Sequence, residues 1–565
     1  MPSVQWMGLR VALSCACAFA ASAAAAQPAA PRDSLHVPAE LARPPFLPGT
    51  PTEGFELPPL PSPEGRPTAP RSRGEVLRTL AIRGNAAIAT EALMEVARPW
   101  LDQPADPADL EALRVAITRH YVEQGYVNSG AGLDADGPRG GVLGMEIVEG
   151  RLTRLRFSGL DGLDERYLAS RLWPDAEAPL QLNALRERHQ LLLDDPLIRR
   201  MNARLLPDAG PGTAALDVEV ERAAPWSLAV RFNNHRSASV GERAVTVDAG
   251  YRNFTGRGDA LRLTVQPDAE ARKLARLGLG WSIPLVYPGT QLTLQFDDGD
   301  STVVEEPLRA ADVRSRIISH EVGLSHTQWE SLQHRAAVGV AWLSRRNETS
   351  IGGMRFPFVA GVPDEGLRGR SVRLWQEYTY RSQDVVLALR STFTRTRNNL
   401  LPVAGAADRS ASFWLGQAQY ARRLGDSGLQ AVARAVVQHT RHRLPGLDGL
   451  SIGGVGSVRG WRENQLIRDR GTILNLELEI PVLHSNASGS SLHLLPFVDY
   501  GRGSNVGQGA DTVGSAGLAL RWRRGPWTTE AAWGRRMLST VGKARAGHAF
   551  QDHGLHFQLS YAQGR

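Results

Sequence analysis

The sequence predicts an all-β transmembrane barrel of about sixteen antiparallel strands that follows two small α+β domains. Three observations carry this prediction. An apolar leader opens the chain, one plan of helices and strands occurs twice between residues 75 and 223, and alternating segments fill the remainder of the 565 residues. Apolar residues make up 42% and charged residues 22%, which excludes a wholly disordered chain.

Residues 1–26 are predicted to be a secretory signal peptide. Arg10 precedes a compact apolar run that ends in an Ala-x-Ala cleavage pattern. The only cysteines, Cys15 and Cys17, lie inside this leader, and the residues before each fit a lipoprotein signal poorly. We therefore expect an exported chain without disulfides or a thiol-ligated metal. No later run of 18 apolar residues occurs, which leaves a soluble periplasmic protein, a secreted protein or an outer-membrane barrel.

Residues 27–74 form a linker that is dense in proline and is expected to be extended or disordered. A short plug helix could lie at residues 34–42, but Pro38 would interrupt it.

Residues 75–150 are expected to form the first small α+β domain. Residues 76–82 alternate like a strand, and further strands are predicted from Tyr126 and over residues 141–150. Asp106 followed by proline is a helix start. The apolar positions of that helix recur at helical spacing and are Leu110, Leu113, Ile117 and Tyr121.

Residues 151–223 repeat the plan. Residues 154–159 mirror the first strand, and residues 201–206 and 215–220 bracket a turn suited to a hairpin. One helical face carries Leu182, Leu185, His189 and Leu192. A strand-helix-helix-strand-strand unit that occurs twice is an internal repeat of about 75 residues. His189 is interpreted as part of the helix face and not as a ligand.

Residues 224–565 read as the barrel. Period-two alternation recurs, for example in residues 227–232, 261–265, 291–296 and 473–480, with turn residues between the segments. Each strand with its connection takes about 21 residues, which suits tilted membrane strands joined by short and long connections. Ten of the thirteen tryptophans fall here, as aromatic girdles would require. The alternative is a soluble array of β-sandwiches or a propeller.

Two motifs stand out in the second half of the barrel region. The first is Gly453-Gly454 followed by Val458-Arg459-Gly460-Trp461; its glycine spacing and the missing Lys-Ser/Thr exclude a phosphate loop. The second contains Phe497, Asp499 and Gly501, which share one face of a strand while Val498 and Tyr500 share the other. Asp499 is therefore expected to face the lumen, where a charge needs a partner.

A VRG-aromatic loop preceded by GG, and followed about forty residues later by an F-x-D-x-G strand, resembles the TpsB transporters of two-partner secretion, within the superfamily that also holds outer-membrane assembly factors. Trp461 stands where the family more often has Phe or Tyr. The two repeats are similar to paired POTRA domains. The last aromatic residue, Tyr561, is followed by four residues, which leaves the end of the final strand open.

The resemblance implies export of a large adhesin or haemolysin across the outer membrane of a Gram-negative bacterium. The POTRA domains would receive the unfolded client in the periplasm by adding it as a strand to an exposed sheet edge. Expected partners are this exoprotein, outer-membrane lipid, and periplasmic chaperones and the barrel assembly machinery during biogenesis. The alternatives are a barrel assembly factor and a passive porin or receptor.

No cofactor, nucleic acid or catalysis is predicted. The net charge of +7 is not concentrated in a basic run. His320-Glu321 begins like a zinc-binding H-E-x-x-H, but the second His, His326, comes two positions too late.

We expect the loop at residues 441–470 to fold back into the barrel and to place the Arg459 guanidinium on the Asp499 carboxylate. A planar fork suits bidentate pairing, and Gly460 permits close backbone approach.

Overall fold

The structure is a computed structural model that describes residues 41, 43–48, 55–56, 74–268, 273–285, 289–485, 489–541 and 547–564. They fall into two compact units: one lies within residues 50–223, and the other joins residues 224–565 to the described part of 41–48. The expected signal peptide, and all of the possible plug helix except Leu41, lie outside the described residues. No helix in the described ranges has the length and apolar character needed to span a bilayer.

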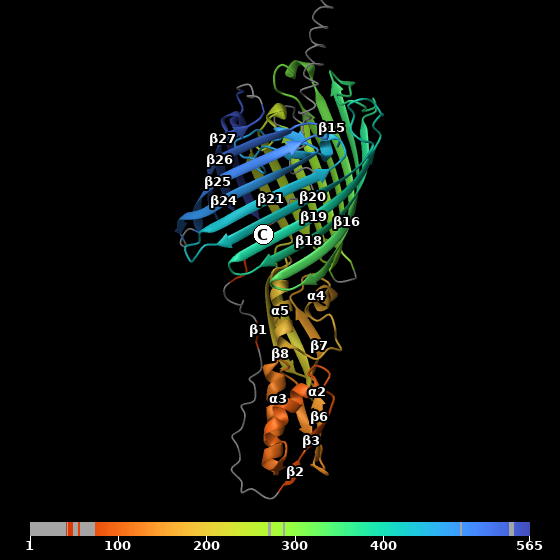
Figure 1. Cartoon of the computed structure of the whole chain (residues 1–565), viewed down its shortest axis with the longest axis vertical. Coiled ribbons are helices and arrows are strands. Elements are labelled where there is room, and N and C mark those ends of the chain that lie inside the picture. Colours follow the sequence, from red (N-terminus) through yellow and green to blue (C-terminus); the bar gives the residue numbers. More distant parts are fainter. Residues whose placement is uncertain are drawn as a thin grey trace, which may run out of the picture. The chain divides into compact units, whose positions relative to one another are not determined.

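Within the described residues, sixteen long antiparallel strands close into a barrel, which confirms the predicted fold class (Figure 1). A two-residue strand, β17 (Met354–Arg355), is attached to one of them. The barrel strands are β10 (Trp226–Asn233), β11 (Ala244–Arg252), β12 (Ala260–Asp268), β13 (Lys273–Pro284), β14 (Thr290–Thr302), β15 (Arg314–Glu330), β16 (His334–Ile351), β18 (Leu367–Arg381), β19 (Val385–Asn398), β20 (Ser410–Arg423), β21 (Gln430–Thr440), β24 (Arg470–Ser485), β25 (Ser490–Ser504), β26 (Ala510–Arg524), β27 (Trp527–Ser539) and β28 (Leu555–Gln563).

The chain enters and leaves the barrel at the same end because the number of strands is even. We call this the terminal end and the opposite one the loop end, which carries long connections such as residues 441–469 and 540–554. Strand β28 pairs with β10 over six residues of each strand and closes the barrel. It ends at Gln563, and Tyr561 packs edge-on against Trp527 with ring centroids 4.9 Å apart.

Side chains of the barrel alternate between the two faces of its wall, as period-two segments require. On β24, Leu474, Leu476 and Leu478 are 44%, 59% and 40% exposed on the outer face. Glu477 and Glu479, on the alternate positions, point inward, where Glu479 is 7% exposed. An apolar outer face around a polar interior is the arrangement of a membrane barrel and not of a soluble sandwich.

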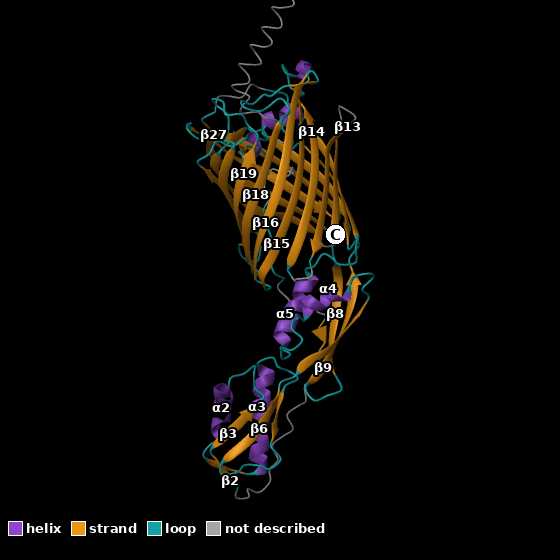
Figure 2. Cartoon of the chain, turned by 90° about the vertical axis from the view of Figure 1, so that its right-hand side faces the viewer, coloured by secondary structure: helices purple, strands orange, loops and turns teal. Residues whose placement is uncertain are grey.

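The second small domain has the predicted order of helices and strands, and the first has it with an added strand between its two helices (Figure 2). Each domain encloses its own apolar core. The first consists of β2 (Glu75–Leu77), β3 (Thr79–Arg83), α2 (Thr90–Ala97), a 3-10 turn (Arg98–Trp100), β4 (Gln103–Ala105), α3 (Pro107–Glu123), β5 (Gly130–Leu133) and β6 (Val142–Val148). The second consists of β7 (Arg151–Ser158), α4 (Glu165–Leu172), α5 (Leu182–Leu193), β8 (Ile198–Pro207) and β9 (Thr213–Arg222).

Two predicted strands of the first domain were wrong in detail. The strand expected over residues 76–82 is broken at Arg78, because β2 leaves the main sheet to pair with β4 while β3 pairs with β6. The strand expected from Tyr126 begins at Gly130. Tyr126 is instead held in a turn, where its carbonyl accepts a hydrogen bond from the Ser129 N–H at 3.1 Å.

Helix α3 starts where the sequence predicts. The Asp106 carboxylate accepts hydrogen bonds from the backbone N–H groups of Ala108 and Asp109, both at 2.8 Å, and so caps two orphan donors. In the second domain, the expected face of α5 is buried, and His189 Nε2 lies 3.1 Å from the Met201 carbonyl.

A short strand from the proline-rich linker covers one edge of the second domain. Strand β1 (Phe55–Glu56) pairs in parallel with β8, with Phe55 opposite Ala203 and Glu56 opposite Arg204. The sheet order is therefore β1-β8-β9-β7. One sheet edge of the second domain is thus occupied by this chain's own linker and is not free for strand addition.

Candidate functional site in the barrel lumen

The connection between β21 and β24, residues 441–469, folds back into the lumen, and we call it the inner loop. It contains a small hairpin of β22 (Leu450–Ile452) and β23 (Leu466–Arg468) after a 3-10 turn at Gly446–Asp448. Ile452 and Val458 are fully buried, and they pack in one apolar cluster with the wall residues Ile473 and Val513. Apolar burial therefore holds the loop against the inner wall.

Arg459 lies on Asp499, which is 1% exposed on β25. The guanidinium donates from Nε to Oδ2 at 2.8 Å and from Nη2 to Oδ1 at 2.9 Å. The backbone N–H of Arg459 donates to Oδ2 at 3.0 Å, and Asn475 Nδ2 donates to Oδ1 at 2.8 Å. Four donors thus compensate a buried carboxylate, which would otherwise be costly to bury.

The Phe497 ring and a second carboxylate complete the surroundings of Arg459. The guanidinium carbon is 3.6 Å from the Phe497 ring centroid, within the range of a cation–π contact. Nη1 donates a hydrogen bond to the Glu477 carboxylate. Phe497 is itself fixed in a small apolar cluster with Leu495 and Ala519. The F-x-D-x-G strand therefore supplies both the ring and the carboxylate.

Gly460 and Gly501 permit close approach of the loop to the wall. Gly460 has φ +86°, and a Cβ there would lie 2.5 Å from the carbonyl oxygen of Gly534 on β27. A Cβ on Gly501 would lie 2.4 Å from Ile452 Cγ2 and 2.9 Å from Val458 Cγ2. Only glycine fits at either place.

The remaining motif residues shape the loop around this contact. Gly453 and Gly454 have φ of +111° and +98°, and the space beside Gly454 is filled by the Glu463 carboxylate. Trp461 is 4% exposed, and its Nε1 donates to the Gly514 carbonyl at 3.3 Å. Every motif residue that the sequence singled out is thus in the inner loop or on the wall beneath it.

Arg462 was missed by the sequence reasoning. Its Nε and Nη2 donate to Asp552 at 2.5 and 2.8 Å, and its Nη1 lies 3.0 Å from Glu305. These acids belong to the connections before β28 and before β15, so Arg462 joins the inner loop to two other loops. The hydrogen bonds to Asp552 raise the pKa of Arg462 more than burial lowers it, so the guanidinium stays charged.

Arg521 on β26 extends the charge network from the inner loop toward the linker. It lies 4.0 Å from Glu477, donates to Glu479 at 2.9 Å, and donates to Glu530 at 2.8 Å. Glu479 is also 3.7 Å from the linker residue Arg43. The sequence could have indicated the two wall carboxylates, since alternation in residues 473–480 places them on the polar face.

The described linker residues 41 and 43–48 lie inside the barrel. Gln419 Nε2 donates to the carbonyl of Leu41, which is 3% exposed. The Leu47 N–H donates to the Ser382 carbonyl at 3.0 Å, in a turn at the terminal end. The Arg423 guanidinium carbon is 4.5 Å from the Phe46 ring centroid. Two segments, the inner loop and the linker, therefore occupy the lumen.

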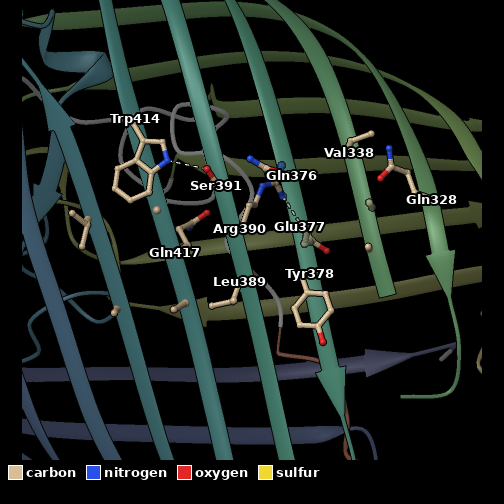
Figure 3. Close-up of a pocket in the computed structure, with 16 residues that line it drawn as sticks. Gln328, Val338, Gln376, Glu377, Tyr378, Leu389, Arg390, Ser391, Trp414 and Gln417 are labelled. Atoms are coloured by element: carbon tan, nitrogen blue, oxygen red, sulfur yellow. Dashed lines mark hydrogen bonds and ion pairs between the residues drawn. The ribbon is translucent and has the colours of Figure 1, made fainter. Parts of the chain in front are cut away.

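Other candidate features lie outside the lumen site. His320 is exposed on the outer face of β15, whereas Glu321 points inward to Arg373 at 3.0 Å, so the two cannot share a metal. In the described residues, no cluster of three or more His, Cys, Asp or Glu side chains has metal-binding geometry. A groove of about 490 Å³ is lined mostly by outward positions of β16 to β21, including Ser391 and Trp414 (Figure 3).

Comparison with family models gives two matches. Residues 212–523 match the model of the haemolysin secretion/activation protein family ShlB/FhaC/HecB, and residues 76–150 match the ShlB-type POTRA domain.

Comparisons with single proteins point the same way. The chain is 24% identical over 426 residues to an outer membrane transporter CdiB of Escherichia coli, covering 71% of this chain and 68% of the relative. The structure of CdiB from E. coli has a TM-score of 0.67 at 20% identity, covering 89% and 94% of the two chains. BamA from Haemophilus ducreyi lacking POTRA domains 1–3 has a TM-score of 0.50 at 13% identity, covering 87% and 100%. These structural likenesses show the fold.

Proposed function

The chain belongs to the haemolysin secretion/activation family ShlB/FhaC/HecB, and from this premise we propose that it exports one large exoprotein of the adhesin or haemolysin type. The family consists of outer-membrane transporters of two-partner secretion with POTRA domains, and this chain is such a transporter. The client class, its route and the roles of single residues are our proposals.

The observation that carries the proposal is the inner loop docked through Arg459 on Asp499 within a closed wall. A continuous ladder of strands surrounds a lumen that holds the inner loop and the linker segment 41–48. Neither is paired with the strand ladder of the wall, since side-chain contacts and isolated backbone hydrogen bonds such as Leu47–Ser382 hold them, so both can be displaced while the wall stays closed. We propose that client passage requires this displacement.

The seam between β10 and β28 favours passage through the lumen over lateral release into the membrane. Asn234, just beyond β10, donates from Nδ2 to the Leu555 carbonyl at 2.9 Å and accepts from the Phe557 N–H at 2.8 Å. Gln551 Nε2 donates to the carbonyls of Asn234 and Arg236 at 2.5 and 2.7 Å. These bonds continue the six-residue pairing of the seam. They weigh against the alternative of an assembly factor that inserts barrels, and the likeness to BamA shows the fold alone.

We propose that the two POTRA domains receive the unfolded client in the periplasm. Strand addition needs an edge with unpaired backbone groups. Linker strand β1 covers the β8 edge, and β3, β5 and β7 form the other edges of the two larger sheets, which are the ones long enough to take up a client strand. The client therefore either displaces β1 or uses one of those three strands.

The energy source is proposed to be folding of the exoprotein outside the cell, since no nucleotide is available to a transporter in the outer membrane. We also propose that residues 1–26 direct export as a signal peptide. Periplasmic chaperones and the barrel assembly machinery would then assist insertion of the barrel. Outer-membrane lipid would contact the apolar outer face of the wall.

Secretion in a two-gene system tests the proposal. The candidate client is a large exported repeat protein to be sought among the neighbouring genes, and cells that express it should release it only when this transporter is present. An Arg459→Ala variant should be inserted normally and should retain the client inside. Equal release with and without the transporter would contradict export.

Binding to soluble fragments tests the receptor role. Fragments 50–223 and 75–223, which respectively contain and lack β1, are titrated with the N-terminal secretion domain of the client in a calorimeter. If β8 is the client edge, the shorter fragment should bind more tightly. Equal affinities would assign β3, β5 or β7, and no binding to either folded fragment would refute the receptor role.

Planar bilayers test the lumen. The intact protein should form a pore whose conductance rises when residues 27–74 are deleted, because the deletion removes the segment that contacts Ser382 and Gln419. Silent bilayers for both forms would contradict an openable lumen.

A further inference from the structure

The outer face of the barrel carries a cluster of arginines at the loop end of three neighbouring strands. Its members alternate with buried residues such as Ser371 and Thr396, at 4% and 3% exposure, and therefore point away from the lumen. The cluster, which we call the arginine patch, consists of Arg346 on β16, Arg368 and Arg370 on β18, and Arg395 and Arg397 on β19.

The strand register places like charges directly opposite each other in this patch. Arg346 is paired with Arg368, and Arg370 is paired with Arg397. Like charges in directly opposite positions on one face of a sheet destabilise it. Two such pairs on adjacent strands are unfavourable unless an anion lies between the guanidinium groups.

Among the residues that the structure describes, no carboxylate side chain lies between both pairs of guanidinium groups. Arg346 has a carboxylate partner, Glu348, at 2.5 Å. None of the other four patch arginines forms an ion pair with a described carboxylate.

The neighbouring strands show the contrast. On β15, Arg316 pairs with Asp298 at 2.6 Å and Arg314 with Asp312 at 2.8 Å, so outward arginines there are balanced within the protein. The arginines of β18 and β19 therefore differ from those of β15, which have carboxylate partners within the protein.

An apolar surface continues from the patch toward the terminal end. Four large apolar residues on the outer face of these strands, on the terminal side of the patch, are 44–54% exposed: Trp342, Val372, Leu374 and Phe393. Beyond them, the groove of about 490 Å³ begins at Gln376 and Ser391 (Figure 3). Gln376 lies six positions after Arg370 on β18, which corresponds to about 20 Å along the strand.

We propose that the arginine patch and the groove bind a phosphorylated glycolipid of the outer leaflet. The phosphates would lie between the paired guanidinium groups, where bidentate hydrogen bonds are available. The acyl chains would follow the apolar row into the groove. Arginine is tolerated on a lipid-facing wall near the interface and not at the midplane, which agrees with its place at the strand ends. The proposal rests on the proposed function in one respect, that the loop end faces the outside of the cell.

The test uses the full-length purified protein in detergent with a bisphosphorylated lipid A as the probe. The double variant R370Q/R397Q removes one of the opposed pairs. The matched control is R502Q/R535Q, which removes two outward arginines from β25 and β27 and changes the net charge equally. Native mass spectrometry and a fluorescence titration report the bound lipid, and none of these residues belongs to the lumen site.

We expect R370Q/R397Q to bind lipid A at least about tenfold more weakly than the control, because charge-assisted bonds to two guanidinium groups are lost. Without lipid, its unfolding temperature should equal or exceed that of the control, since a repulsive pair is gone. Dephosphorylated lipid A should bind as weakly to the intact protein as the phosphorylated form does to the variant.

Equal affinity of the variant and the control would overturn the proposal. Full competition by millimolar inorganic phosphate would also overturn it, because it would reveal a simple anion site. Secretion is measured in parallel on the same variants. Loss of lipid binding by R370Q/R397Q with intact secretion supports the lipid site alone. If the intact protein binds lipid A but exports no client, the transport role is refuted and the lipid site stands.

Discussion

The second POTRA domain buries Leu185, Leu216 and their neighbours in an apolar core, whereas the barrel interior buries Asp499 and Arg373. In the small domain, the sheet and the helices exist because their apolar faces meet. In the barrel, the ladder of backbone hydrogen bonds closes on itself, and the interior side chains are free to be polar. The difference teaches that substitutions in the small domains should unfold them, while substitutions in the lumen should release segments from an intact wall.

The largest effect should come from the small-domain core. Leu185→Ala in fragment 50–223 should lower the free energy of unfolding by about 2–5 kcal/mol, because the residue is fully buried and its removal leaves a cavity. Urea denaturation followed by circular dichroism measures it. Val142→Ala, at a position 40% exposed, is the control and should cost less than about 0.5 kcal/mol. A similar loss for both variants would break the comparison.

The second effect concerns the lumen. Arg459→Ala and Asp499→Ala should each reduce secretion strongly while the barrel remains inserted and heat-modifiable. Removing one partner of a buried pair costs about 3–5 kcal/mol, and a hydrated lumen lowers that figure. The double variant should be little worse than either single variant, since both act through one contact. Arg502→Gln, on the outer face of the same strand as Asp499, is the control. Normal secretion by both single variants, or simple additivity, would rule out the anchor.

A smaller effect should appear at the carboxylate that joins the linker to the network. Glu479→Gln weakens contacts to both Arg43 and Arg521, and it should raise the frequency of open events in planar bilayers by a factor of about five, which corresponds to about 1 kcal/mol. The control is Glu530→Gln, because Glu530 contacts Arg521 but not Arg43. Identical single-channel records for the two variants would show that the linker is not held there.

The smallest effect is a pH dependence in the second POTRA domain. Burial lowers the pKa of His189, and the hydrogen bond to the Met201 carbonyl only partly opposes this. The unfolded chain therefore binds a proton more readily near pH 6.5 than the folded one does. Stability of fragment 50–223 should fall as the pH drops below about 6.5, by up to about 1.4 kcal/mol per pH unit. His189→Gln should flatten this slope in urea denaturation, and an unchanged slope would exclude His189 as its source.

Local patterns were sufficient for most of the fold. Period-two alternation located the barrel strands and placed Asp499 inward, and helical spacing located α3 and α5, because each pattern depends on a few neighbouring residues. The same alternation places Asp499 and Glu477 inward, and the expected inward fold of the loop then brings Arg459 to them.

Contacts between distant segments could not be read in this way. Arg462 meets Asp552 and Glu305, which are 90 and 157 residues away, and no periodicity links them. The pairing of β1 with β8 involves two residues of each strand. The opposition of Arg370 and Arg397 depends on the register between two strands, which alternation leaves undetermined.

Gly534 and Gly460 touch through backbone atoms alone. A Cβ on Gly534 would lie 2.9 Å from the carbonyl carbon of Arg459 and from Gly460 Cα. Side chains can change rotamer and keep a partial contact as two surfaces separate. Backbone atoms cannot extend in this way, so a contact between two backbones is lost at once. The inner loop should therefore behave as a latch with an engaged and a released position and no graded intermediate. Gly534→Ala offers a way to open this latch by steric pressure while every charge in the lumen stays in place.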